Sequence, residues 1–106
     1  MDQTIEWLGY SFRKYKHTVY TWPVKFEKGP GNFIFCSIDA DYTWSPIYIG
    51  ETNDLSEPFV NHRKMRCIMG LGATHVHAHA NSGGEAARLD ERNELIQIYD
   101  PICQHF

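Results

Sequence analysis

Three histidines alternate with small apolar residues in the C-terminal half of the chain, at His75, His77 and His79. If this stretch is a strand, all three side chains point to one face and successive histidines lie about 6–7 Å apart. A His-x-His pair on a strand is a known zinc-binding arrangement. The alternative is an ordinary strand with a polar face. The remaining histidines, which offer further ligands, are His17, His62 and His105.

Two short basic stretches lie on a chain whose formal net charge is −3. Residues 13–17 and residues 62–66 each hold three of the ten lysines and arginines. A basic patch can hold nucleic acid by neutralising its phosphates, whereas an isolated run of charge is more often a solvated face. The net charge therefore does not exclude nucleic acid, but it does not support it. The aromatic residues that could stack on bases, or simply fill the core, are Trp7, Trp22, Tyr42, Trp44 and Tyr48.

The composition, with 42% apolar and 22% charged residues in 106, is that of one ordinary globular domain. Cys36, Cys67 and Cys103 are odd in number, widely spaced and without a Cys-x-x-Cys motif. This pattern predicts reduced thiols, a cytoplasmic location and no cysteine metal site. The apolar runs are far shorter than a membrane span, and the N-terminus lacks a secretory pattern, so no membrane partner is expected.

The secondary-structure signals predict an α+β fold, with a small mixed or antiparallel sheet flanked by helices. Residues 1–16 show no clear period and are expected to be a short helix or a lead-in loop. A first helix is expected from Asn53 or Asp54 to the break at Gly70, and a second over residues 85–99, ended by Pro101. The strands are expected over residues 17–22, 32–37, 47–50 and 74–80.

Short motifs follow one another in a characteristic order. Gly31-Asn32-Phe33 precedes Tyr48-Ile49-Gly50, and a frame reading Glu51-Thr52-Asn53-Asp54-Leu55-Ser56-Glu57 and then Asn61-His62 comes next. The later blocks are residues 72–79, 88–91, 94–96 and 99–101. In this order the motifs resemble the GIY-YIG nuclease superfamily, and most of all its small stand-alone members. The resemblance covers residues 17–106 as one domain after a lead-in over residues 1–16, and it implies the fold of that superfamily.

The resemblance also implies a site for cutting phosphodiesters. It places two strand tyrosines at the phosphate, an arginine on the first helix, a glutamate that holds Mg²⁺ or Mn²⁺, and often a C-terminal asparagine. A phosphate that gains charge needs a fixed cation and a Lewis acid, and the attacking water needs a base. Tyr48 and His62 stand at matching positions and remain candidate catalytic residues. His62 would be a general base or a phosphate donor, although a helix-surface histidine is an equal alternative.

The other positions are altered. Phe33 keeps the ring of the first tyrosine and loses its hydroxyl, and Pro58 replaces the arginine and supplies neither charge nor donor. Gln104 stands at the asparagine position, as a longer amide. Counting nine residues back from Pro101 puts Arg92 at the metal-binding glutamate, where a guanidinium would repel a divalent cation.

Glu91 is adjacent to Arg92, but it lies about 100° around the helix. It could take the metal only if the helix were locally rewound.

These residues predict a catalytically inactive GIY-YIG-like domain that binds nucleic acid or a protein partner and needs no cofactor. The alternative is an active metal-dependent endonuclease with a remodelled site, in which Glu91 would hold Mg²⁺ or Mn²⁺. A weaker alternative is a structural domain stabilised by zinc through His75, His77 and His79.

Overall fold

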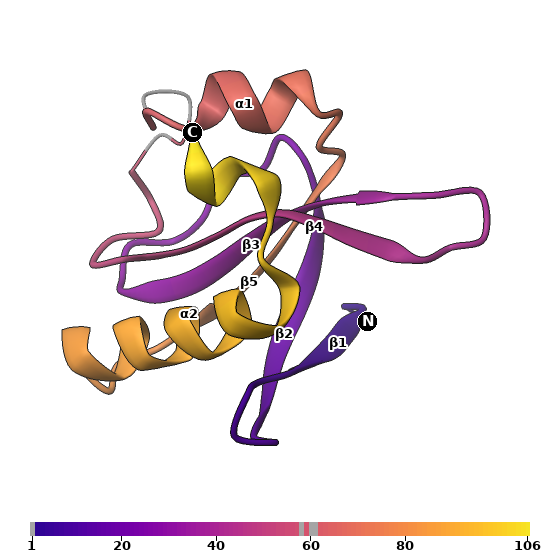
Figure 1. The fold of residues 1–106 in the computed structure, drawn as a ribbon. Coiled ribbons are helices and arrows are strands. Elements are labelled where there is room, and N and C mark those ends of the chain that lie inside the picture. The colour runs from indigo at the N-terminus through magenta and orange to yellow at the C-terminus, as the bar shows by residue number, and fades with distance from the viewer. Residues whose placement is uncertain (1, 58, 60–61) are drawn as a thin grey trace.

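The structure is a computed structural model that describes residues 2–57, 59 and 62–106. Within these residues, five strands form one antiparallel sheet in the spatial order β1-β2-β5-β3-β4. The strands are β1 (Thr4–Leu8), β2 (Lys14–Thr21), β3 (Gly31–Ile38), β4 (Trp44–Thr52) and β5 (His75–Ala80). The helices are α1 (Met65–Gly70), α2 (Glu85–Tyr99) and the 3₁₀ turn η2 (Ile102–His105). The predicted α+β class is confirmed (Figure 1).

Strand β3 lies inside the sheet and is covered on both faces. Its first six residues, Gly31 to Cys36, are all buried. Because successive side chains of a strand point to opposite faces, Phe33 and Phe35 lie on one side and Ile34 and Cys36 on the other. Helix α1 covers the first side and α2 the second, and the two helices lie on opposite sides of the sheet in Figure 1.

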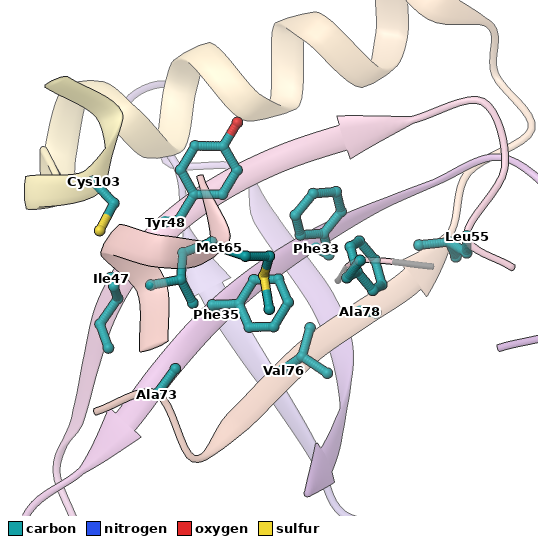
Figure 2. Close-up of a cluster of buried hydrophobic side chains, with 12 residues drawn as sticks. Phe33, Phe35, Ile47, Tyr48, Leu55, Met65, Ala73, Val76, Ala78 and Cys103 are labelled. Atoms are coloured by element: carbon teal, nitrogen blue, oxygen red, sulfur yellow. The ribbon is translucent and has the colours of Figure 1, made fainter. Parts of the chain in front are cut away.

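The larger core, called here the α1-side core, lies between the sheet, α1 and η2 (Figure 2). Aromatic rings dominate it: Phe59 lies 4.8 Å from Phe33 and 5.4 Å from Phe35 between ring centroids. A β-bulge between Phe35 and Cys36 shifts the register with β4. The buried members are Phe33, Phe35, Ile47, Tyr48, Leu55, Phe59, Met65, Ile68, Ala73, Val76, Ala78 and Cys103.

A smaller core, called here the α2-side core, lies between the sheet and α2. Its buried members are Trp7, Ile34, Cys36, Ile49 and Leu95. Three of the aromatic residues that could either stack on bases or fill the core are packing groups. Trp7 lies in this core, Trp22 packs on Phe35, and Trp44 packs on histidines of β5. Tyr42, by contrast, is 84% exposed.

The N-terminal segment differs from the prediction of a short helix or a lead-in loop. It contains β1, which pairs with β2 in the register Thr4↔Thr18 to Leu8↔Lys14. Glu94 of α2 binds this hairpin, because its carboxylate accepts hydrogen bonds from Ser11 and Tyr15.

The first helix is much shorter than predicted. Helix α1 begins at Met65, whereas the sequence predicted a start at Asn53 or Asp54. The Asp54 carboxylate instead accepts hydrogen bonds from the backbone N–H groups of Ser56 and Gly29, at 3.0 and 3.2 Å. A short acidic side chain that bonds nearby backbone in this way favours a turn over a helix. Helix α2, in contrast, has the predicted bounds and ends at Tyr99, followed by Asp100, which has a left-handed backbone.

The prediction of reduced thiols is wrong for two of the three cysteines. Cys67 of α1 and Cys103 of η2 form a disulfide, with their Cα atoms 5.8 Å apart, while Cys36 is free and buried. The two partners are 36 residues apart in the sequence, so no local motif marks them. The fold brings η2 back onto α1, and Lys64 strengthens this contact by donating hydrogen bonds to the carbonyl groups of Gln104 and Phe106.

In the described part of the chain, no helix is both long and apolar enough to cross a membrane.

The disulfide should contribute strongly to stability. Its removal frees a loop of 36 residues in the unfolded chain, which predicts a loss of roughly 3–4 kcal/mol in the free energy of unfolding. Urea unfolding with and without dithiothreitol measures the loss. The variant Cys67→Ser with Cys103→Ser should match the reduced protein and be insensitive to reductant. Equal stability of the parent protein in both conditions would contradict the prediction.

Candidate functional site

The two strand motifs meet where β3 pairs with β4. Phe33 is 1% exposed and pairs with Gly50, where an added Cβ would come within 2.5 Å of the Phe33 ring. Gly50 must therefore lack a side chain for Phe33 to lie across it. Tyr48 packs its ring 6.1 Å from that of Phe33, and its hydroxyl points away from the other labelled side chains in Figure 2. The ring of Tyr48 belongs to the core, whereas its hydroxyl lies at the edge.

His62 completes this aromatic group from the segment before α1. Its ring centroid lies 5.2 Å from that of Tyr48. Its Nδ1 accepts a hydrogen bond from the backbone N–H of Lys64 at 3.1 Å, so the neutral ring carries its proton on Nε2. Burial lowers the pKa of His62, and the positive charges of Arg63 and Lys64 lower it further. A neutral imidazole can accept a proton from a group that binds beside it.

The positive charges of two guanidinium groups affect the pKa of the Tyr48 hydroxyl. Burial raises the pKa of Tyr48, whereas the charges of Arg92 and Arg63 lower it and the charge of Glu51 raises it. The Glu51 carboxylate accepts a hydrogen bond from Nε of Arg88 at 3.0 Å, which offsets its negative charge. We call Tyr48, His62, Arg63 and Arg92 the Tyr48 face. Its charge balance is positive although the chain as a whole is acidic.

A small hollow of about 180 Å³ adjoins Phe33 and His62. Its carboxylates, from Glu51, Asp54 and Glu57, make it negative. These carboxylates disfavour an anion in the hollow itself.

Gln104 has a structural role in this structure. Its side-chain amide accepts a hydrogen bond from the backbone N–H of Ile49 at 2.6 Å and donates one to the carbonyl of Ile49 at 2.9 Å. Both ends of the amide therefore hold η2 against β4, an edge strand whose backbone would otherwise lack these partners. Pro58, the other altered position, lies outside the described residues.

Glu91 and Arg92 are neighbours on α2, yet they lie in different surroundings. Arg92 acts on Tyr48 and donates hydrogen bonds to the side chain of Asn93 at 3.1 and 3.3 Å. Glu91 is 3% exposed, and its carboxylate contacts the imidazoles of His17 and His79. The turn of about 100° between successive helix residues separates the two side chains. Mg²⁺ or Mn²⁺ does not fit at the Arg92 position, because the guanidinium there repels a divalent cation.

The three histidines of β5 share a face but not a site. Nδ1 of His77 accepts a hydrogen bond from the indole of Trp7 at 2.9 Å, and the ring packs 4.5 Å from that of Trp44. His75 packs on the same Trp44, at 4.9 Å. His79 alone turns toward α2 and Glu91. The described residues therefore do not bring the three together as a zinc ligand set.

A different group of potential metal ligands does come together: His17 of β2, His79 of β5 and Glu91 of α2. Their donor atoms all lie within 4.8 Å of one another. The close contacts with His79 and His17 lower the pKa of Glu91 despite its burial. Burial lowers the pKa of His79, but the hydrogen bond to Glu91 and the charge of that carboxylate outweigh burial and raise it. Sequence reasoning offered His17 as a further ligand for the β5 histidines but did not join Glu91 to them, because that combination depends on strand register and on the position of α2.

Comparison with protein-family models, curated proteins and solved structures gives no match. The GIY-YIG resemblance therefore remains a prediction from the sequence motifs.

The pKa of His62 offers a test of the Tyr48 face. It should lie below the ordinary value of about 6.5, and Arg63→Gln should raise it by removing a nearby positive charge. In the parent protein, His62 binds a proton more tightly in the unfolded chain than in the folded one. The stability that neutral His62 contributes is therefore complete above about pH 6.5 and is lost as the pH falls below that value. NMR titration of the histidine ring protons measures the pKa of His62 in the parent protein and in the Arg63→Gln variant. The control Arg13→Gln removes an equal charge elsewhere and should leave His62 unchanged.

Proposed function

We propose that this chain is a GIY-YIG-like module that binds nucleic acid through its phosphates and does not cleave it. The observation that carries the proposal is the presence of two guanidinium groups, those of Arg63 and Arg92, within electrostatic range of the Tyr48 hydroxyl. Guanidinium groups recognise phosphate oxygens through paired hydrogen bonds, and a phenol adds a donor. These are the groups that hold a phosphate in its ground state.

The same residues disfavour cleavage. Phe33 lacks the hydroxyl of the first strand tyrosine, and Arg92 replaces the carboxylate that would hold a metal ion. Without a Lewis acid, the charge that develops on a phosphate during hydrolysis loses its main stabilising partner. Tyr48 and His62 are retained, and in this proposal they contact a bound phosphate rather than activate water.

Binding should be weak and dependent on salt, because a chain of net charge −3 attracts nucleic acid only at a local face. Each arginine that contacts a phosphate should contribute about 0.9 to the slope of log affinity against log salt for duplex DNA, and about 0.7 for single strands. The proposal thus yields a quantity that can be measured one residue at a time.

The test is fluorescence anisotropy with single-stranded, double-stranded and branched DNA and with RNA, at several salt concentrations. Arg92→Gln and Arg63→Gln should each weaken binding and lower the salt slope by about one phosphate contact. The matched control is Arg13→Gln. Arg13 lies in the other basic stretch, and its guanidinium pairs with the carboxylate of Asp90 at 3.9 Å. If Arg13→Gln weakened binding as much as Arg92→Gln and Arg63→Gln do, binding would depend on the net charge of the chain and not on the Tyr48 face.

A cleavage assay with Mg²⁺ or Mn²⁺ on the same nucleic acids should give no product. Metal-dependent cleavage that Tyr48→Phe abolishes would contradict the proposal and favour the endonuclease with a remodelled site. Absence of both binding and cleavage would also contradict it, and the candidate would then be a protein partner.

The predicted cytoplasmic location remains a prediction. The Cys67–Cys103 disulfide weighs against it, because structural disulfides are rare in reducing compartments.

A further inference from the structure

We propose that His17, His79 and Glu91 form a binding site for a divalent transition-metal ion, with Zn²⁺ as the ion that best suits the ligands. Two imidazole nitrogens and one carboxylate oxygen form a common zinc ligand set. Imidazole ligands disfavour Mg²⁺, which prefers oxygen. The site is separate from the Tyr48 face, so it does not rest on the proposed function. It also differs from a site made by the three β5 histidines, since His75 and His77 pack on tryptophans.

Rigid elements bring the three ligands together. Thr18 of β2 pairs with Ala78 of β5, so His17 and His79 take the next cross-strand positions in this antiparallel register. Their rings meet edge to face, with centroids 4.6 Å apart. Helix α2 places the Glu91 carboxylate against both rings. Ligands on two paired strands and a packed helix are held more precisely than ligands on loops.

Both imidazoles are oriented as metal ligands usually are. Nδ1 of His17 lies 3.0 Å from the carbonyl oxygen of Tyr15, and Nδ1 of His79 lies 2.9 Å from that of Ala80. A carbonyl only accepts, so each Nδ1 carries a proton. Once Nε2 carries no proton, each ring directs the lone pair of Nε2 into the cluster. Metal-bound histidines characteristically donate their other ring N–H to such an acceptor.

The donor atoms of these three side chains surround a position that a cation would occupy favourably. Nε2 of His79 lies 2.8 and 2.9 Å from the two carboxylate oxygens of Glu91, so a proton can link this pair. His17 is 1% exposed, and its Nε2 has no hydrogen-bond partner among the described residues, although it lies 3.5 Å from Glu91 Oε2. A buried nitrogen left unpaired is costly. One metal ion would satisfy all three donors.

The distances suit zinc after a small adjustment. Ligands about 2.1 Å from a tetrahedral ion lie about 3.4 Å from one another. The 3.5 Å between His17 and Glu91 already matches this spacing, whereas the 2.8 Å between His79 and Glu91 must widen as the ion replaces the shared proton. The His79 side chain is 25% exposed, while those of His17 and Glu91 are almost fully buried. The ion therefore enters, and a water ligand binds, from the side of His79.

The test uses the full chain, stripped with chelator and titrated with Zn²⁺ in a calorimeter. We expect one ion per chain, together with a rise in melting temperature that chelator reverses. Co²⁺ should give the absorption bands of a tetrahedral site with nitrogen and oxygen ligands. His79→Gln and Glu91→Gln should each weaken Zn²⁺ binding by roughly 100-fold or more, since each removes a direct ligand.

The matched control is His75→Gln, which removes a histidine from the same strand and face and should leave Zn²⁺ affinity unchanged. Far-ultraviolet circular dichroism checks the folding of each variant, and the partly exposed His79 gives a variant expected to fold if Glu91→Gln does not. The proposal is overturned if the parent protein binds no Zn²⁺, or if folded His79→Gln binds as tightly as the parent. An equal loss in His75→Gln would also overturn it, because the ligands would then be the β5 histidines.

Discussion

The burial of β3 on both faces is the constraint on which the rest of the structure depends. Six consecutive residues of this strand are buried, and a strand with apolar side chains on both faces requires a covering layer on each side. Helix α2 supplies one layer. The other is assembled from smaller parts: the short α1, the side chain of Phe59, and η2. The Cys67–Cys103 disulfide joins α1 to η2, and the Gln104 amide holds η2 to β4.

This layering separates two groups of chemically capable residues. Helix α2 contributes to both, since Arg92 acts on Tyr48 while Glu91 lies between His17 and His79. The turn of about 100° from one residue to the next thus assigns a positive charge to one group and a negative charge to the other. The Tyr48 face is positive and suits an anion, whereas the histidine cluster holds a carboxylate and suits a cation. One helix can support both chemistries because the charges lie in different surroundings.

Several polar residues that look functional in the sequence have structural roles. Gln104 supplies a pair of backbone-like hydrogen bonds to the edge strand, and the amine of Lys64 binds carbonyl groups at the C-terminus. His77 accepts the indole proton of Trp7 inside the core, where burial, together with the nearby His17 and His75, lowers its pKa to about 4. Most buried polar groups require a partner, so the side chains of Gln104, Lys64 and His77 serve the interior rather than a ligand, although Nε2 of His77 has no hydrogen-bond partner among the described residues.

Local pattern was sufficient for much of the secondary structure. The β-branched and aromatic runs predicted the central strands, and helix α2 has the predicted bounds because its periodic stretch ends at Asp100-Pro101. The prediction was wrong at the N-terminus, where β1 has no clear period of its own and is held by pairing with β2. It was also wrong for the first helix, because the bonds of Asp54 to Ser56 and Gly29 favour a turn.

The sequence by itself determined the α+β class, the residues that alternate on β5 and the chemical character of each candidate side chain. Only the tertiary structure decided which of them meet. Cys67 reaches Cys103 and His17 reaches His79 across long stretches of sequence, and whether such residues come together depends on strand register and on how the helices pack. Local propensity does not carry that information, because it concerns neighbours along the chain, whereas a site is built from neighbours in space.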